Sequence, residues 1–191
     1  MQAWRDLGKV AIVATIFGVC FAILASVIGP MSPWLGLLLM FYFMGLSKVA
    51  EPLFKLRMPQ ALRAVDPRPV TEGIYRWLGV RGFGTLLRNT PLRYLNGSVY
   101  LAGGRRSLVE MSRQTESAEA IHFWAAVLFT PYIAYVWSQD LIAETVLFVL
   151  VQVLFNVYPI LHLRSVRARL DRVNQAAGAR RGEEPQGNGD A

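Results

Sequence analysis

The chain has 191 residues, of which 53% are hydrophobic and only 17% are charged, and its net charge is +7. A soluble domain would carry about 25% charged residues, and its apolar residues would not gather into long runs as they do here. One cysteine and two histidines argue against an internal disulfide and against a cysteine or multi-histidine metal site. The composition therefore indicates an integral membrane protein.

The N-terminal region contains two apolar runs. The first, Val10–Gly29, is longer than the apolar core of a secretory signal peptide, which has about 7–15 residues. A turn with two prolines leads directly into the second run, Trp34–Leu46, and proline suits such a turn because it cannot continue a helix. We therefore predict an uncleaved transmembrane hairpin over residues 1–47.

The central segment, residues 48–118, differs from the apolar runs on either side of it. It mixes arginines with aromatic residues, and four prolines interrupt its first half. This composition is typical of short helices at the headgroup level, with apolar sides in lipid and arginines near phosphates. A helical pattern returns at Ser107, and we expect it to continue into the third membrane helix.

The next region, residues 119–173, contains two further apolar runs, Phe123–Trp137 and Leu141–Leu163. A short polar loop without a basic residue joins them, which indicates a second transmembrane hairpin. Residues 174–191 contain few apolar side chains and are expected to be disordered. The predicted fold is thus all-α, with about four transmembrane helices in two hairpins and a cytosolic or interfacial segment between the hairpins.

The basic residues predict how the helices are oriented. Every Lys and Arg lies before the first predicted helix, between the second and the third, or after the fourth. The positive-inside rule then places both termini and the central segment in the cytosol, as in a multi-pass protein of a bacterial-type inner membrane. Basic charge in these positions indicates contact with anionic membrane lipid rather than with nucleic acid.

Two ionisable residues stand at the cytosolic end of the third predicted helix. Glu119 and His122 are three residues apart, so on a helix they lie on one face. A carboxylate in that position can bond one ring nitrogen and orient the imidazole, which leaves the other nitrogen to accept a proton. The alternative is that the pair only marks the polar rim where the helix enters the membrane.

The fourth predicted helix carries polar residues near its cytosolic end. Asn156 and Tyr158 lie within about two turns of that end. Because polar groups that face lipid are costly, these side chains should point into the helix bundle. The predicted topology brings them to the same membrane depth as His122, which makes this group a candidate site.

A basic cluster follows the fourth predicted helix, at Arg164, Arg167 and Arg169. Guanidinium groups grip phosphate well, so this cluster has the chemistry to hold a phosphate-bearing donor such as a coenzyme A thioester. The alternative is that the arginines only anchor the helix end at anionic lipid.

These motifs together resemble a known family, the glycosyl-4,4'-diaponeurosporenoate acyltransferases, which are small membrane enzymes of carotenoid biosynthesis. The resemblance rests on two motifs, a basic cluster and a weaker upstream pattern: Glu119-Ala120-Ile121-His122, Asn156-Val157-Tyr158-Pro159, Arg164 to Leu170, and Trp77 to Phe83. It covers roughly Trp77 to Leu170. The chain departs from the family in a longer central segment around Leu92–Arg106 and in its polar tail, and the longer segment bears on the acceptor more than on the reaction.

The resemblance implies an O-acyltransferase that esterifies a sugar hydroxyl of a glycosylated carotenoid or a related glycolipid. The implied donor is an acyl-CoA or acyl-carrier thioester that acts as co-substrate, with no cofactor and no metal. The implied catalytic residues are His122 as general base and Glu119 as its orienting carboxylate. The implied substrate-binding residues are Asn156, Tyr158, Arg164, Arg167, Arg169 and Arg81. The alternative is a non-catalytic membrane scaffold that binds anionic lipid or a protein partner.

Overall fold

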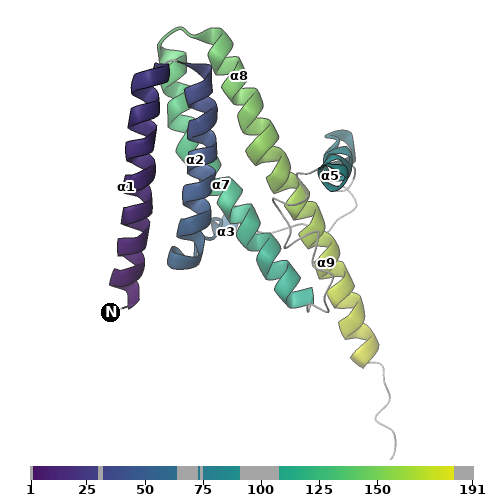
Figure 1. Ribbon diagram of the computed structural model, residues 1–191. Helices are drawn as coiled ribbons and strands as arrows, with labels where there is room; N and C mark the ends of the chain where they lie inside the picture. Colours follow the sequence, from purple (N-terminus) through teal and green to yellow (C-terminus); the bar gives the residue numbers. More distant parts are fainter. Residues whose placement is uncertain (1, 30–31, 64–72, 74, 91–107, 183–191) are drawn as a thin grey trace, which may run out of the picture. The chain divides into compact units, whose positions relative to one another are not determined.

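A computed structural model describes residues 2–29, 32–63, 73, 75–90 and 108–182 of the chain. Within these residues the chain is helical and contains no strand, which confirms the all-α prediction. Figure 1 shows the elements, which in chain order are α1 (Gln2–Ile28), α2 (Pro33–Phe54), α3 (Gln60–Arg63), α5 (Val80–Asn89), α7 (Leu108–Ser138), α8 (Ile142–Gln152), η2 (Val153–Val157) and α9 (Tyr158–Gly182).

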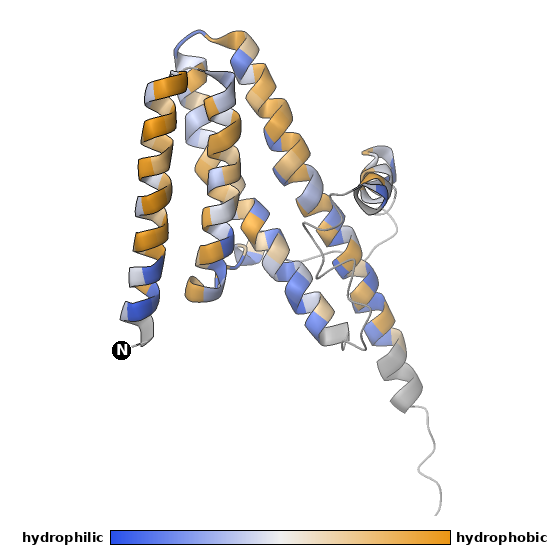
Figure 2. Cartoon of the chain, in the orientation of Figure 1, coloured by the Kyte–Doolittle hydropathy of each residue, from blue (hydrophilic) through white to orange (hydrophobic). Residues whose placement is uncertain are grey.

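Four stretches in the described part of the chain are long and apolar enough to cross a membrane, which confirms the predicted number of transmembrane helices. Figure 2 shows apolar residues along most of α1 and α8, whereas polar residues become frequent toward the Leu108 end of α7. The four stretches are Trp4–Ile28, Pro33–Phe54, Glu110–Ser138 and Ile142–Ala176.

The chain divides into two compact units. The first unit consists of Met1–Arg63 and Ser117–Leu161, and the second consists of Ala64–Glu116 and His162–Ala191. The sequence predicts a division into 1–47, 48–118, 119–173 and 174–191, and this division stays a prediction.

Three helices form the core of the first unit around Phe148 of α8. The Phe148 ring meets Phe129 of α7 edge to face, with ring centroids 6.0 Å apart. On its other side the ring lies against Gly36 of α2, where a Cβ atom would overlap it. Glycine at this position therefore lets α2 approach α8 closely, and Met40, one turn further along α2, is fully buried in the same core.

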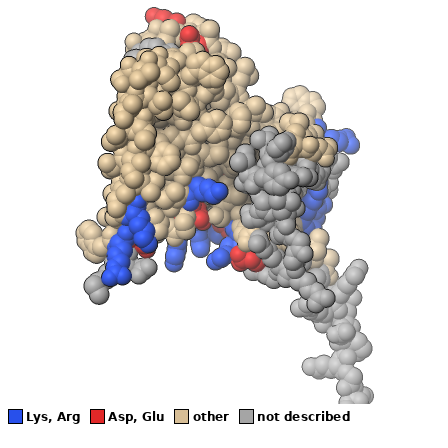
Figure 3. All heavy atoms as spheres, in the orientation of Figure 1, with Lys and Arg blue, Asp and Glu red and all other residues tan. Residues whose placement is uncertain are grey.

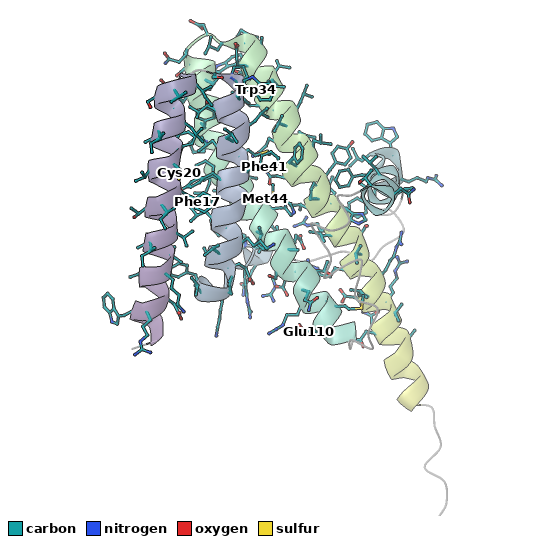
Figure 4. The ribbon with its side chains drawn as sticks, in the orientation of Figure 1. Phe17, Cys20, Trp34, Phe41, Met44 and Glu110 are labelled. Atoms are coloured by element: carbon teal, nitrogen blue, oxygen red, sulfur yellow. The ribbon has the colours of Figure 1, made fainter. Side chains whose placement is uncertain are left out.

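Two further contacts join the helices of the first unit. Tyr42 of α2 packs against Phe17 of α1, with ring centroids 5.3 Å apart. On the opposite side of α2, Phe41 meets the Phe155 ring of η2 edge to face at 5.4 Å, and Figure 4 shows the direction of the Phe41 side chain. Helix α1 contacts the unit through α2, and most of its apolar surface is exposed, as expected for a helix that faces lipid.

Helix α2 ends in a left-handed turn that directs the chain back toward α7. Lys55 has a φ of 49°, and the Leu56 N–H bonds the Glu51 carbonyl across the turn, an arrangement that satisfies a carbonyl at a helix end. Beyond the turn, the Arg57 carbonyl accepts a hydrogen bond from the indole nitrogen of Trp124 at 3.2 Å. This bond ties the end of α2 to α7 close to His122.

Basic side chains gather at the end of the first hairpin where α1 begins and α2 ends. Figure 3 shows basic side chains, with some acidic ones among them, at the end where α1 begins, and acidic side chains alone at the opposite end. Arg5 and Lys9 lie in the first turns of α1, and Lys48 and Lys55 lie in or just after the last turns of α2. This charge asymmetry fits the predicted cytosolic location of the N-terminus, which stays a prediction.

The structure extends two helices beyond the apolar runs. Helix α7 is continuous from Leu108, as the pattern starting at Ser107 predicted. Helix α9 continues to Gly182, although disorder was expected from residue 174. Five of the nine additional residues are alanine or arginine, which have high intrinsic helix propensity. Residues 183–191 lie outside the described residues.

In the second unit, helix α5 packs against α9 through a glycine. The His162 ring lies so close to Gly84 that a Cβ atom there would come within 2.5 Å of the imidazole Cε1. Phe83 meets the same ring edge to face at 6.2 Å. Helix α5 is one of the short helices expected in the central segment, and its position at the membrane surface stays a prediction; residues 64–72 and 91–107 lie outside the described residues.

Candidate active site

Helix α7 brings Glu119 and His122 into the first unit. Glu119 is 0% exposed, and His122 is partly buried. Glu119 has an interaction partner, as expected because a buried carboxylate without a partner is costly in an apolar setting. Both residues thus belong to the interior of the unit, whereas the alternative interpretation places them at a solvated helix rim.

A wide helical turn lies in the other helix of the second hairpin. Between α8 and α9 the five residues of η2 form a π-helix, in which the Tyr158 N–H bonds the carbonyl of Val153 five residues earlier. Proline explains this turn: Pro159 has no N–H, so the Phe155 carbonyl loses the donor that a regular α-helix would supply. Single π-turns of this kind occur frequently at functional sites.

The π-turn changes which residue faces the interior. In a regular α-helix, the position seven residues after Phe148 would return to the buried face. The wide turn absorbs one additional residue, so the buried position falls eight residues after Phe148, at Asn156. Asn156 is accordingly 0% exposed, whereas its neighbour Phe155 is partly exposed.

A hydrogen-bonded chain fixes the orientation of the Asn156 amide. The Gln152 amide nitrogen donates to the Ala126 carbonyl at 2.9 Å, and the Asn156 amide nitrogen donates to the Gln152 amide oxygen at 2.8 Å. A backbone carbonyl can only accept, so Gln152 must point its nitrogen toward Ala126 and its oxygen toward Asn156. Asn156 must then point its nitrogen toward Gln152, which leaves its oxygen, Oδ1, directed elsewhere.

The remaining acceptor groups interact with His122. The His122 ring interacts with the Asn156 side chain and with the backbone of Phe155, the residue whose carbonyl Pro159 leaves without its usual donor. Within the described residues, neither Nδ1 of His122 nor Oδ1 of Asn156 makes a hydrogen bond of strict geometry, although both atoms are buried. These two atoms are therefore available to a substrate or to each other.

This arrangement suits proton transfer in a low-dielectric interior. Two neutral acceptors, an amide oxygen and a backbone carbonyl, can hold one imidazole N–H and leave the other ring nitrogen to accept a proton. A neutral orienting group avoids the cost of a second buried charge beside the ring. The geometry therefore allows a general base that becomes charged only during the reaction.

The other residues named from the sequence lie in several places. Tyr158 is partly exposed at the first position of α9, in the first unit, and it has an interaction partner. Three arginines belong to the second unit and differ in burial: Arg167 is 5% exposed, Arg164 is partly exposed and Arg169 is exposed. The backbone of Arg81 lies in α5, but its side chain is outside the described part of the chain.

Sequence reasoning singled out Asn156 and expected Gln152 to point into the bundle, but it did not predict the hydrogen bond between them. Gln152 lies four residues before Asn156, so the two share a helix face. That spacing and Pro159 were the available signals, and neither identifies Ala126 as the acceptor on α7.

Comparison with known proteins identifies the family. Residues 60–176, more than half of the chain, match the sequence model of the glycosyl-4,4'-diaponeurosporenoate acyltransferases, and the match includes α5, α7, α8 and most of α9. No curated protein and no solved structure matches the chain significantly. The family match confirms the resemblance read from the Glu119 and Asn156 motifs. The chain belongs to the glycosyl-4,4'-diaponeurosporenoate acyltransferase family.

Proposed function

We propose that this protein transfers a fatty acyl group from an acyl thioester to a sugar hydroxyl of a glycosylated carotenoid, and that the reaction occurs at His122. Membership of an acyltransferase family supports the class of reaction. The observation that carries the location is the buried contact between His122 and the oriented Asn156 amide. Both residues lie in helices long and apolar enough to span a membrane, which suits two substrates with long apolar chains.

The proposed reaction begins with His122 as general base. Its imidazole takes the proton of the sugar hydroxyl while that oxygen attacks the thioester carbonyl carbon, so that a C–O bond forms and an oxyanion develops. The oxyanion then collapses, the C–S bond breaks, and the leaving thiolate takes the proton from the imidazolium. The products are an ester and a free thiol, and His122 is neutral again.

Three neighbouring groups assist His122 in this proposal. Asn156 presents its amide oxygen to the imidazole, since its nitrogen is bonded to Gln152. Glu119, fully buried three residues before His122 on α7, favours the imidazolium that forms during the reaction. Tyr158 has a hydroxyl that can donate to the developing oxyanion.

The arginines bind the phosphate-bearing part of the acyl donor in this proposal. Arg164, Arg167 and Arg169 bind the phosphates of an acyl-CoA or an acyl-carrier thioester in this proposal, and Arg81 contributes to the same function. The acyl chain and the carotenoid remain in lipid. The enzyme works without a metal or a resident cofactor, in a bacterial-type cell membrane with both termini in the cytosol.

The proposed function can be tested in cells that make a glycosylated carotenoid but lack this chain. Pigments are extracted with and without expression of the protein, and their masses are measured. We expect pigments heavier by one fatty acyl group in the expressing cells, and alkaline hydrolysis should return them to the parent mass. Unchanged pigments in cells with verified membrane expression would refute the carotenoid as acceptor. Whole-lipid profiling of the same cells then separates another glycolipid acceptor from a scaffold without activity.

A further inference from the structure

Helix α2 carries a buried hydroxyl that the family match, which begins at residue 60, does not cover. Ser47 is 2% exposed, and its Oγ atom is buried without a hydrogen-bond partner among the described residues. A hydroxyl taken out of water without compensation costs about 1–3 kcal/mol. A single alanine would avoid this cost, so the hydroxyl calls for an explanation.

Six other serine and threonine hydroxyls on the described helices behave differently. A helical serine or threonine usually donates to a carbonyl three or four residues earlier. In the described part of the chain these six make that bond, at distances of 2.7–2.8 Å: Ser26, Thr115, Thr130, Ser138, Thr145 and Ser165. The Ser47 hydroxyl does not, so it keeps its donor available within the interior of the first unit.

Helix geometry places Ser47 at the level of His122. Met40 of α2 and Phe129 of α7 lie in the same apolar core. Ser47 follows Met40 by seven residues, and His122 precedes Phe129 by seven. Because α2 and α7 run in opposite directions (Figure 1), both steps lead the same way along the bundle. Seven helical residues advance about 10.5 Å and return to nearly the same face.

A second observation supports this placement. The Arg57 carbonyl, just beyond the end of α2, accepts the bond from Trp124, two residues after His122. The chain just beyond α2 is therefore held beside the part of α7 that carries the base. Ser47 lies about two helical turns before the end of α2, and its exposed neighbour Lys48 points to a different side.

We infer that Ser47 is a further catalytic residue, whose hydroxyl donates a hydrogen bond to the carbonyl oxygen of the acyl donor as that oxygen becomes an oxyanion. The inference rests on the proposed function. A donor that meets its acceptor only during the reaction accounts for both the burial of the hydroxyl and its lack of a partner in the protein. A single donor of this kind contributes about 10²–10³-fold to the rate.

The test separates catalysis from structure by replacing Ser47→Ala. Removing an unsatisfied buried hydroxyl should leave the thermal unfolding temperature unchanged or slightly raised. The turnover number for ester formation should fall about 10²–10³-fold. Ser26→Ala, the same change at an exposed hydroxyl of α1 that bonds the Ile23 carbonyl, should change neither quantity. Ser47→Cys, a weaker donor of similar shape, should give an intermediate rate.

The measurements use purified full-length protein in lipid vesicles, with an acyl-CoA and a glycosylated carotenoid as probes. A fully active Ser47→Ala variant would overturn the inference and leave the proposed function intact. A variant that loses thermal stability together with activity would assign Ser47 a structural role, which also overturns the inference. If the parent protein forms no ester, the proposed function fails, and the inference fails with it.

Discussion

The two histidines of this chain occupy opposite kinds of surroundings, although both lie in helices apolar enough to span a membrane. His122, in the first unit, interacts with an amide side chain and a backbone group, and its Nδ1 atom is buried without a strict hydrogen bond. His162, in the second unit, is 8% exposed and lies against Phe83 and the backbone of Gly84.

The comparison shows that burial does not by itself identify a catalytic histidine. The His162 ring fills a space that glycine leaves open, so its shape contributes to the packing of α5 on α9. The His122 ring lies beside an amide whose orientation is fixed through Gln152 by the Ala126 carbonyl. In the proposed account, His122 differs from His162 in what its ring contacts. A hydrogen-bonding amide of fixed orientation suits a reactive imidazole, whereas contact with glycine suits one that only packs.

Among the groups that orient His122, the largest effect is expected from removing the Asn156 amide. Asn156→Leu keeps the volume of the side chain and removes its oxygen, so the imidazole loses its orienting partner. We expect the rate of ester formation to fall about 100-fold, because small misplacements of a catalytic group have effects of this size. This fall is measured from initial rates of ester formation at a saturating concentration of the acyl donor. An unchanged rate in a stably folded variant would refute the role of Asn156.

A smaller effect on the rate is expected at Gln152, which contacts Asn156 rather than His122. Gln152→Leu removes both the donor to Ala126 and the acceptor of the Asn156 amide, which leaves that amide free to rotate. The turnover number should fall about 10-fold, while the KM for the donor changes little. Thr145→Val serves as the control, since the buried Thr145 hydroxyl of α8 bonds the Leu141 carbonyl of its own hairpin helix, and its rate should stay near that of the parent. Equal losses in the two variants would contradict the orienting role.

A change at the packing site of His162 should lower stability with little change in activity. Gly84→Ala places a methyl group within 2.5 Å of the His162 ring, and overpacking of this kind costs about 1–3 kcal/mol. Thermal unfolding in detergent should occur at a lower temperature, whereas the rate per folded molecule should stay the same. In a double-mutant cycle, His162→Ala should relieve much of the loss. Additive losses would show that the methyl group clashes with something else.

The fold followed from the sequence where lipid imposes strong constraints. Apolar runs had to form four helices, and the spacing of Glu119 and His122 placed both on one helix. The periodic pattern did not reveal the π-turn, because a single additional residue shifts the buried face from position 155 to Asn156 and depends on Pro159. The pairing of Gln152 with Ala126 also escaped prediction, since it joins two helices through a backbone atom that every residue type possesses.

The most direct test of the central claim compares the two histidines in the same assay. Purified parent protein, His122→Ala and His162→Ala are each placed in lipid vesicles with an acyl-CoA and a glycosylated carotenoid, and the ester and the released thiol are measured together. The account predicts one thiol per ester for the parent, a rate lowered about 10²–10⁴-fold in His122→Ala, and a rate per folded molecule close to that of the parent in His162→Ala. Ester formation by His122→Ala at the rate of the parent would contradict it.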